Sequence, residues 1–324
     1  MDLLEVRGLT KAFPLNGGRR LTAVNSVSLR VGQNRILGIV GESGCGKSTL
    51  GRLMLRLIAP TAGQVFFRGR EIGALGRRAL LPFRRAMQMV FQNPFASFNP
   101  KMRIAGALME VCRYYGMTRA AGRERVEGLF EDIGLPRELL ARWPRELSGG
   151  QLQRLAIARA LLSDPALIVA DEPLSALDVS VQAQLLNLLE NLRKTRGTAM
   201  VFISHDMTVV EYLCDAVAVM YLGSIMELAP AGELFDNTLH PYTRSLKEAV
   251  PRLETGLRGH EKYGFSHGPS ADAEKRRFSA GRFGTAEPHC PFAPRCGEAA
   301  PRCRAEAPFL REISSGHFVS CHRV

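Results

Sequence analysis

The feature that most constrains this 324-residue chain is a loop with the sequence Gly41-Glu-Ser-Gly-Cys-Gly-Lys-Ser-Thr49. It fits the pattern G-x-x-x-x-G-K-[ST], and it lies between a short apolar run and a segment typical of a helix. Such a loop turns its backbone N–H groups toward phosphate oxygens, and the helix N-terminus adds positive potential. The sequence therefore predicts a nucleotide site in which Lys47 reaches the terminal phosphates and Ser48 binds Mg²⁺.

Short apolar runs predict the strands of a parallel sheet. Each run is continuous rather than alternating, which is typical of strands buried on both faces of an α/β fold. The runs occupy residues 35–40, 166–170, 199–203 and 216–220. Segments with helical patterns follow them, at residues 47–58, 150–162, 179–194 and 207–214.

Two further regions differ from this alternation. Residues 94–147 have helical periodicity with Gly and Pro breaks and no strand-like run, which predicts a helical insert within the sheet domain. Residues 255–288 are rich in Gly, Ser, Arg and Lys and poor in aliphatic side chains, which predicts a flexible linker or a variable loop. A cysteine-rich tail follows this linker.

Composition excludes few classes of protein. The longest apolar candidate, 216–226, is shorter than the roughly 18 residues that a membrane-spanning helix needs. The N-terminus lacks a basic region followed by an apolar core, so we expect no export signal and a reducing, cytosolic location. The net charge is +12, from 43 Lys+Arg and 31 Asp+Glu. Because this charge is spread along the chain, it does not by itself indicate a nucleic-acid partner.

A second motif predicts hydrolysis rather than transfer. The apolar run Leu167-Ile-Val-Ala ends in Asp171-Glu172. In such a pair one carboxylate holds Mg²⁺ through water, and the second polarises the attacking water. We assign the first role to Asp171 and the second to Glu172.

A third motif, Leu147-Ser-Gly-Gly-Gln151, precedes the helical segment that begins near Gly150. Ser148, small backbones and a helix N-terminus make a second anion site, which has no lysine of its own. A chain that carries both half-sites completes each of them only by pairing head to tail with another chain. The alternative is an ordinary helix start with Ser148 as its N-cap.

With these motifs in this order, the sequence resembles the ATP-binding-cassette (ABC) superfamily. The resemblance implies that Phe13 packs against adenine, although a lone Phe near a strand is also typical of a core. Gln92 matches the residue that senses Mg²⁺ and water in the loop that contacts the membrane partner. Asp178 matches the loop that crosses the dimer interface, and His205 matches the switch histidine at the γ-phosphate.

The predicted site comprises catalytic, ATP-binding and Mg²⁺-binding residues. The catalytic residues are Lys47, Glu172 and His205. Mg²⁺ is expected at Ser48, Gln92 and Asp171. The residues expected to bind ATP are Phe13, Gly41, Glu42, Ser43, Gly44, Cys45, Gly46, Lys47, Ser48, Thr49, Gln92, Ser148, Gly149, Gly150, Gln151 and Asp178.

Longer stretches resemble the oligopeptide/dipeptide/nickel importer branch of this superfamily, among them residues 91–100 and 240–246. The resemblance implies a P-loop NTPase ABC cassette with a RecA-like parallel sheet core, an antiparallel β subdomain and a helical insert. The implied division is an ATP-binding core at 1–94 and 162–235, a helical subdomain with the signature motif at 95–161, and a C-terminal extension at 236–324. Leu174 and Trp143 depart from the usual pattern without removing a catalytic group.

This branch also implies partners. We expect a second ABC ATPase subunit in a heterodimer, two integral membrane permease subunits and, indirectly, a solute-binding protein. The protein would lie peripherally on the cytoplasmic side of the inner or plasma membrane and energise import of peptides, with nickel as the alternative solute. We expect no nucleic-acid partner.

The alternatives are other ABC ATPases. Repair and condensin-like members need a long insert, whereas 54 residues separate Gln92 from Leu147, and translation factors carry two cassettes per chain. A regulatory cassette without hydrolysis would lack Glu172 or His205.

Four cysteines lie in the tail, separated by five, six and 17 residues. Four thiols in a short polar segment, with no core of its own and in a reducing compartment, favour a metal over disulfides. The loose spacing is compatible with an iron–sulfur cluster, and the resemblance implies a 4Fe–4S cluster there; zinc and unligated thiols are the alternatives. The candidate ligands are Cys290, Cys296, Cys303 and Cys321, with His289, His317 and His322 available in a zinc version.

Overall fold

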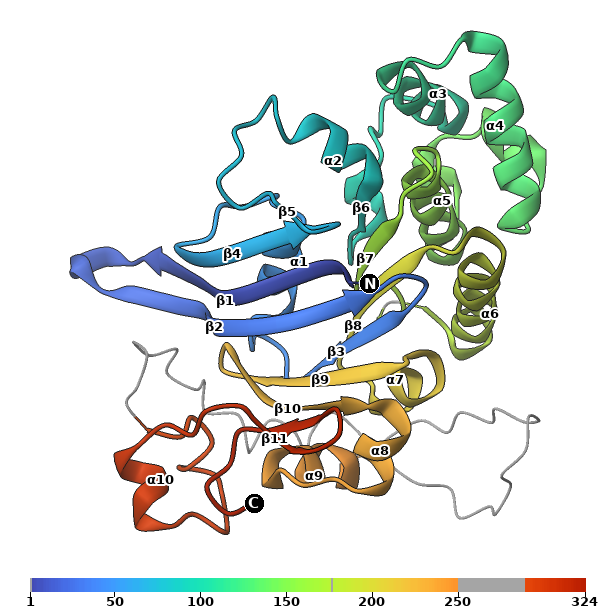
Figure 1. The fold of residues 1–324 in the computed structure, drawn as a ribbon. Coiled ribbons are helices and arrows are strands. Elements are labelled where there is room, and N and C mark those ends of the chain that lie inside the picture. Colours follow the sequence, from blue (N-terminus) through green and yellow to red (C-terminus); the bar gives the residue numbers. More distant parts are fainter. Residues whose placement is uncertain (1, 176, 250–288) are drawn as a thin grey trace.

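The computed structural model describes residues 2–175, 177–249 and 289–324. They form an antiparallel sheet, a larger central sheet and surrounding helices (Figure 1). The antiparallel sheet has the order β2-β1-β4-β5 and consists of β1 (Asp2–Pro14), β2 (Arg20–Gly32), β4 (Ala62–Phe67) and β5 (Arg70–Glu71). The central sheet has the order β11-β12-β10-β9-β3-β8-β7-β6 and consists of β3 (Ile36–Val40), β6 (Met87–Val90), β7 (Leu167–Asp171), β8 (Ala199–Ser204), β9 (Ala216–Tyr221), β10 (Ser224–Pro230), β11 (Arg311–Ser314) and β12 (His317–Val319).

The parallel part of the central sheet contains all of the strands predicted from apolar runs. Strands β6, β7, β8, β3 and β9 run parallel to one another, and β10 pairs antiparallel with β9. The carboxyl ends of the parallel strands therefore lie at one edge of the sheet, which is where α/β folds place their ligand sites. The loop at residues 41–49, the P-loop, follows β3. Glu172 directly follows β7, His205 directly follows β8, and one residue separates Gln92 from the end of β6.

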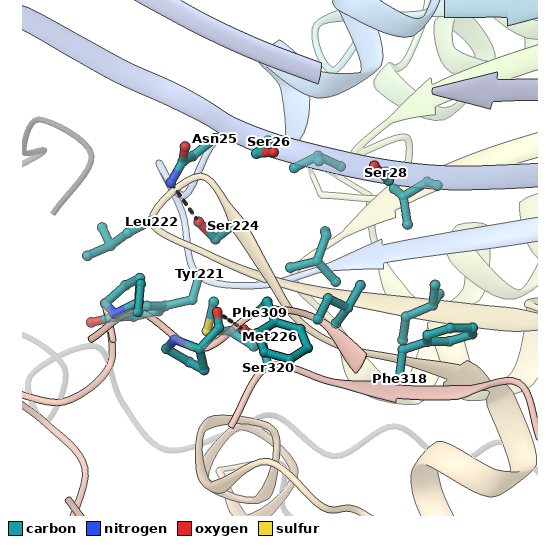
Figure 2. Close-up of a pocket in the computed structure, with 18 of the residues that line it drawn as sticks. Asn25, Ser26, Ser28, Tyr221, Leu222, Ser224, Met226, Phe309, Phe318 and Ser320 are labelled. Carbon is teal, nitrogen blue, oxygen red and sulfur yellow. Dashed lines mark hydrogen bonds between the residues drawn. The ribbon is translucent and has the colours of Figure 1, made fainter. Parts of the chain in front are cut away.

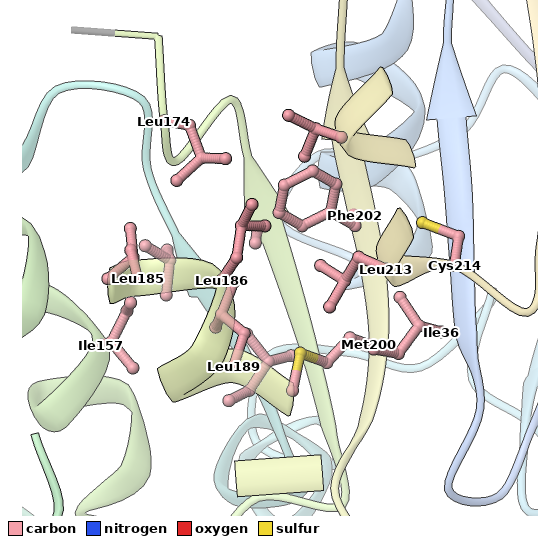
Figure 3. Close-up of a cluster of buried hydrophobic side chains, with 14 of the residues drawn as sticks. Ile36, Ile157, Leu174, Leu185, Leu186, Leu189, Met200, Phe202, Leu213 and Cys214 are labelled. Atoms are coloured by element: carbon pink, nitrogen blue, oxygen red, sulfur yellow. The ribbon is translucent and has the colours of Figure 1, made fainter. Parts of the chain in front are cut away.

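The central sheet separates two cores, which explains why its strands are apolar on both faces. On one face Ile36, Met200 and Phe202 pack with side chains of helix α6 (Val179–Arg196), as Figure 3 shows. On the other face Leu37 and Val201 belong to the core shared with α1 and the antiparallel sheet. Successive side chains of one strand point to opposite faces, so each strand contributes to both cores.

The described residues form the helices α1 (Lys47–Met54), α2 (Leu81–Ala86), α3 (Ile104–Tyr114), α4 (Arg119–Asp132), α5 (Gly149–Leu161), α6, α7 (Met207–Leu213), α8 (Ala231–Asp236), α9 (Pro241–Glu248) and α10 (Pro301–Ala305). The four helices predicted one by one are present as α1, α5, α6 and α7, with ends shifted by one or two residues in three of them and a larger difference in α1. The prediction of a helix to residue 58 was wrong: α1 ends at Met54, because Arg56 has a left-handed backbone (φ 53°). Among the described residues, no helix is both long enough and apolar enough to cross a membrane.

The predicted helical insert is confirmed, since residues 94–147 contain α3, α4 and short 3₁₀ helices but no strand. Helices α3 and α4 form a lobe beside α5 (Figure 1). Thr118 caps α4 by accepting a hydrogen bond from the N–H of Ala121 at 3.3 Å. Buried side chains of α3 and α4 belong to the same core as those of α5.

The tail, residues 289–324, packs onto the main body, in agreement with the prediction that it has no core of its own. Strands β12 and β11 extend the central sheet beyond β10, so the tail covers the edge of β10. Phe292 and Cys303 are buried in the core that also contains Tyr242 of α9. The tail is therefore part of the main body, and the predicted linker at 255–288 lies outside the described residues.

Candidate functional site

The P-loop is packed so closely that it requires glycine at two positions. A Cβ added at Gly41 would lie 2.1 Å from the carbonyl oxygen of Met220, and one at Gly46 would lie 2.1 Å from that of Ala23. Gly46 also has a φ of 108° immediately before α1 begins. The loop thus forms a narrow backbone cradle at the N-terminus of a helix, the environment that favours an anion.

Lys47 points back into this cradle. Its side chain is only 3% exposed, and its Nζ donates hydrogen bonds to the carbonyl oxygens of Gly41 at 2.7 Å and Glu42 at 2.9 Å. The nearest carboxylate oxygen recorded for it is Oε1 of Glu172, at 3.9 Å. The ammonium group is therefore held chiefly by neutral carbonyls, and phosphate oxygens would be stronger acceptors for it.

Ser48 and Asp171 are hydrogen-bonded to each other and offer two oxygen ligands for a magnesium ion. The hydroxyl of Ser48 donates to Oδ1 of Asp171 at 2.7 Å. Burial raises the pKa of Asp171, while the hydrogen bond from Ser48 acts in the opposite direction. A hydroxyl and a carboxylate placed side by side at a helix N-terminus are oxygen ligands of the kind that Mg²⁺ prefers.

Glu172 follows β7, and its side chain lies beside residues that follow the neighbouring strands β6 and β8. Nε2 of Gln92 donates to its Oε2 at 2.9 Å, and Nδ1 of His205 lies 3.6 Å from the same oxygen. The backbone of Glu172 has a φ of 44°, and its N–H donates to the carbonyl oxygen of Ile203 at 3.0 Å. Left-handed backbone in a residue other than glycine is strained, and such strain concentrates at functional sites.

The residues of the third motif bond to one another. The hydroxyl of Ser148 accepts a hydrogen bond from the N–H of Gln151 at 3.3 Å, and Oε1 of Gln151 accepts one from the N–H of Ser148 at 3.0 Å. This is a capping box at the start of α5. A Cβ at Gly150 would lie 2.6 Å from Cγ1 of Val181, so α5 and α6 pack closely here. Ser148 therefore has the N-cap geometry of the alternative interpretation, in a helix that begins at Gly149.

Phe13 lies on β1 and is half-buried rather than part of a core. The ammonium group of Lys11 lies 5.1 Å from the centre of its ring. Asp178 directly precedes α6 and makes no side-chain cap to it. Gly149 is the first residue of α5. The P-loop residues Lys47, Ser48 and Thr49 form the first turn of α1, and the rest of the loop precedes that helix.

The tail cysteines converge without forming a metal site. The N–H of Cys290 donates to the carbonyl oxygen of Cys303 at 2.9 Å. Burial is the main cause that raises the pKa of Cys290 and of Cys321. Neighbouring thiols raise it further: those of Cys303 and Cys321 for Cys290, and those of Cys303 and Cys296 for Cys321. In residues 2–175, 177–249 and 289–324, however, no group of three or more His, Cys, Asp or Glu residues is arranged to hold a metal ion. The structure therefore gives no support to the predicted cluster.

Two of the histidines proposed for a zinc version each bond to another group through one ring nitrogen. Nε2 of His317 lies 2.8 Å from Oε1 of Glu227 in the core, and Nε2 of His322 lies 3.0 Å from the carbonyl oxygen of Glu306. A zinc version that uses them stays a prediction.

A large cavity of about 1670 Å³ lies apart from the P-loop. Figure 2 shows it between β2, the β9–β10 hairpin and the tail, with Asn25 and Ser224 joined by a hydrogen bond of 3.4 Å. Residues 41–49 do not line it. The cavity is therefore distinct from the predicted phosphate site.

Two contacts to the P-loop come from residues that the sequence did not indicate. The N–H of Glu42 donates to the hydroxyl of Tyr242 at 3.1 Å, and its carboxylate accepts a hydrogen bond from Arg295 at 2.9 Å. Both partners lie about 200 residues or more from Glu42 in the sequence. No local periodicity or motif spacing signals a contact over such a separation.

Comparison with known proteins decides the family. A family model for the ABC transporter matches residues 24–175, and one for the C-terminal region of oligopeptide/dipeptide transporters matches residues 226–303. A peptide import ATP-binding protein of Brucella ovis is 44% identical over 99% of this chain and 98% of its own length. This chain belongs to the oligopeptide/dipeptide ABC transporter ATPase family. The oligopeptide transport ATP-binding protein AppF of Bacillus subtilis is also 44% identical, over 99% of this chain and 97% of its own.

Solved structures agree with the cassette fold. The dimeric structure of a post-hydrolysis state of the ATP-binding cassette MJ0796, bound to ADP and Pi, covers 70% of this chain and 98% of its own at 27% identity, with a TM-score of 0.65. The cbiO1 protein of Clostridium perfringens, at 24% identity and a TM-score of 0.65, has the same fold over 73% of this chain and 91% of its own. The predicted cassette fold is confirmed, and the chain is an ABC ATPase of this family.

Proposed function

We propose that this chain is the ATP-hydrolysing subunit of an importer for peptides. The observation that carries the proposal is the arrangement at the carboxyl edge of the sheet, where Ser48 bonds to Asp171 and Gln92 bonds to Glu172. Relatives of nearly the same length are named peptide import and oligopeptide transport ATP-binding proteins, which supports peptides as the solute.

In this proposal each side chain of the site has one task. Lys47 exchanges its carbonyl partners for the terminal phosphates of ATP, and the loop amides orient those phosphates. Ser48, Asp171 and Gln92 would hold Mg²⁺, which offsets negative charge on the phosphates when it is bound. Glu172 orients and polarises the attacking water, and His205, beside it, contacts the γ-phosphate.

The second half-site is supplied in trans. The capping box of Ser148 and Gln151 presents backbone N–H groups at the N-terminus of α5, where an anion is stabilised. We propose that this surface faces the P-loop of a second ABC ATPase subunit and that Asp178 lies at the same interface. A partner that differs in sequence, in a heterodimer, is part of the proposal.

The proposal also assigns the parts of the chain. Residues 1–94 and 162–235 bind ATP, 95–161 carry the signature motif, and 236–324 form the extension. The region around Gln92 and the lobe of α3 and α4 would contact two membrane permease subunits, to which a solute-binding protein delivers the peptide. The protein would then work at the cytoplasmic face of the membrane.

The tail thiols have no step in this mechanism. A 4Fe–4S cluster, with zinc as its alternative, remains a prediction from cysteine spacing and from the family resemblance, and nothing in the described residues supports it. Iron, sulfide and zinc determinations on anaerobically purified protein test it. Colourless protein with one zinc per chain would exclude the iron–sulfur cluster.

Phosphate release from ATP by the chain assembled with its partner ATPase subunit tests the proposed activity. We expect release in the presence of Mg²⁺ and almost none after EDTA removes it. Ser48 and Asp171 provide oxygen ligands for the ion but no positive charge that could replace it. Readdition of Mg²⁺ should restore the rate. A rate that is the same with and without EDTA would contradict the assignment of this site.

A further inference from the structure

Glu42 of the P-loop is contacted through all three of its polar groups. Its N–H donates to the hydroxyl of Tyr242 at 3.1 Å, and its carbonyl oxygen accepts from Nζ of Lys47 at 2.9 Å. Its carboxylate Oε2 accepts from Nη1 of Arg295 at 2.9 Å. The residue that holds Lys47 is thus itself held by α9 and by the tail.

The side chain of Tyr242 is held in a packed aromatic cluster. Its side chain is fully buried, and its ring lies 4.6 Å from that of Tyr221 and 5.3 Å from that of Phe292, measured between centres. A buried tyrosine hydroxyl requires a hydrogen-bond partner. Here the amide of Glu42 fills this requirement, so the position of the P-loop is tied to a packed aromatic cluster.

Arg295 reaches the same loop from the tail. Its guanidinium group lies 5.7 Å from the ring centre of Tyr221 and 5.9 Å from that of Phe292. The backbone N–H of Arg295 donates to the carbonyl oxygen of Phe292 at 2.9 Å. The hydrogen bond to Glu42 is the largest cause that raises the pKa of Arg295. With 48% of Arg295 and 22% of Glu42 exposed, this is a partly solvated ion pair aligned by two aromatic rings.

We propose that Arg295 and Tyr242 are positioning residues for ATP binding, which hold Glu42 so that the P-loop keeps the shape that receives phosphate. Neither residue touches the reacting atoms in this account. Their effect passes through one residue, Glu42, whose carbonyl group also orients Lys47. The inference rests on the proposed function, because it assumes that the P-loop binds ATP.

Kinetics of ATP hydrolysis by the full chain, assembled with its partner ATPase subunit, provide the test. We expect Arg295→Ala to raise KM for ATP by about three- to tenfold while kcat stays within about twofold, since an ion pair of this exposure has a modest effect on binding. Arg295→Lys, which keeps the charge, should recover part of the affinity. Tyr242→Phe keeps the ring and removes only the acceptor, and we expect a similar or larger rise in KM.

Arg302→Ala is the matched control. Arg302 lies in the same tail and forms an ion pair of the same length, 2.9 Å, with Glu306. Its removal should leave KM unchanged. Equal losses in Arg295→Ala and Arg302→Ala would show that the tail matters only for folding, and would overturn the inference.

A double-variant cycle with Glu42→Gln separates positioning from general damage. If Arg295 acts through Glu42, Arg295→Ala should have little further effect on ATP affinity in the Glu42→Gln protein. Fully additive effects, or wild-type affinity in both Arg295→Ala and Tyr242→Phe, would overturn the inference. A wild-type chain that binds no ATP would instead overturn the proposed function.

Discussion

Glu172→Gln is expected to lower the rate of ATP hydrolysis by about a hundredfold or more while ATP still binds. The amide has nearly the same size as the carboxylate and can still accept the hydrogen bond that Gln92 now donates to Oε2. It cannot polarise water, however, and the loss of a general base has an effect of this order. The P-loop contacts of Lys47 and Ser48 do not depend on the charge of Glu172 in this account. Phosphate release and ATP affinity should both be measured on the same protein.

Glu306→Gln is a suitable control for that variant, because Glu306 lies in the tail, exposed and paired with Arg302. Its hydrolysis rate should equal that of the wild type. Full turnover by Glu172→Gln would contradict the role assigned to Glu172. Loss of ATP binding in this variant would instead indicate that the carboxylate supports the shape of the site.

His317→Ala is expected to destabilise the folded protein by about 3 kcal/mol. His317 and Glu227 are both 0% exposed, and their Nε2 and Oε1 atoms lie 2.8 Å apart. The carboxylate of Glu227 also accepts the N–H groups of Leu239 at 2.8 Å and His240 at 3.1 Å. Removing the imidazole leaves a buried carboxylate with one partner fewer and a cavity between β12 and β10.

The thermal midpoint should fall by about 4 °C in His317→Ala. His322→Ala is the matched control, since His322 is half-buried rather than fully buried and its Nε2 bonds to a backbone carbonyl oxygen, that of Glu306, at 3.0 Å. We expect a change near zero for it. Equal midpoints for the two variants would contradict the view that the buried pair fixes the tail on the sheet.

The nucleotide site was predictable because local chemistry determines it. The spacing of Gly41, Gly46 and Lys47 follows from steric limits within one turn, and the apolar runs place the loop and Glu172 at the ends of strands. Parallel strands then bring Gln92, Glu172 and His205 together without any further information. Their roles in hydrolysis remain proposals that the variants above test.

The C-terminal part was less predictable because its contacts are non-local. Pairing of β12 with β10 joins residues about 90 positions apart, and nothing in the tail sequence specifies that register. Cysteine spacing gives the distance between thiols along the chain but not in space, so it did not determine a metal site. The burial of His317 beside Glu227 likewise depends on this strand pairing.

Interactions of Glu42 show the same limit at the site itself. The loop motif predicts where Lys47 lies, but it allows any residue at the position of Glu42. Arg295 reaches Glu42 only because the tail folds back on the hairpin of β9 and β10. The part of the site that depends on tertiary packing was therefore absent from the prediction.

ATP-driven uptake by the assembled transporter tests the central claim most directly. Vesicles would contain this chain, its partner ATPase and the two permease subunits, with the solute-binding protein outside and ATP inside. We predict accumulation of a labelled oligopeptide that requires ATP and is lost with Glu172→Gln. Accumulation of labelled Ni²⁺ but not of peptide, or peptide uptake that is unchanged by Glu172→Gln, would contradict the account.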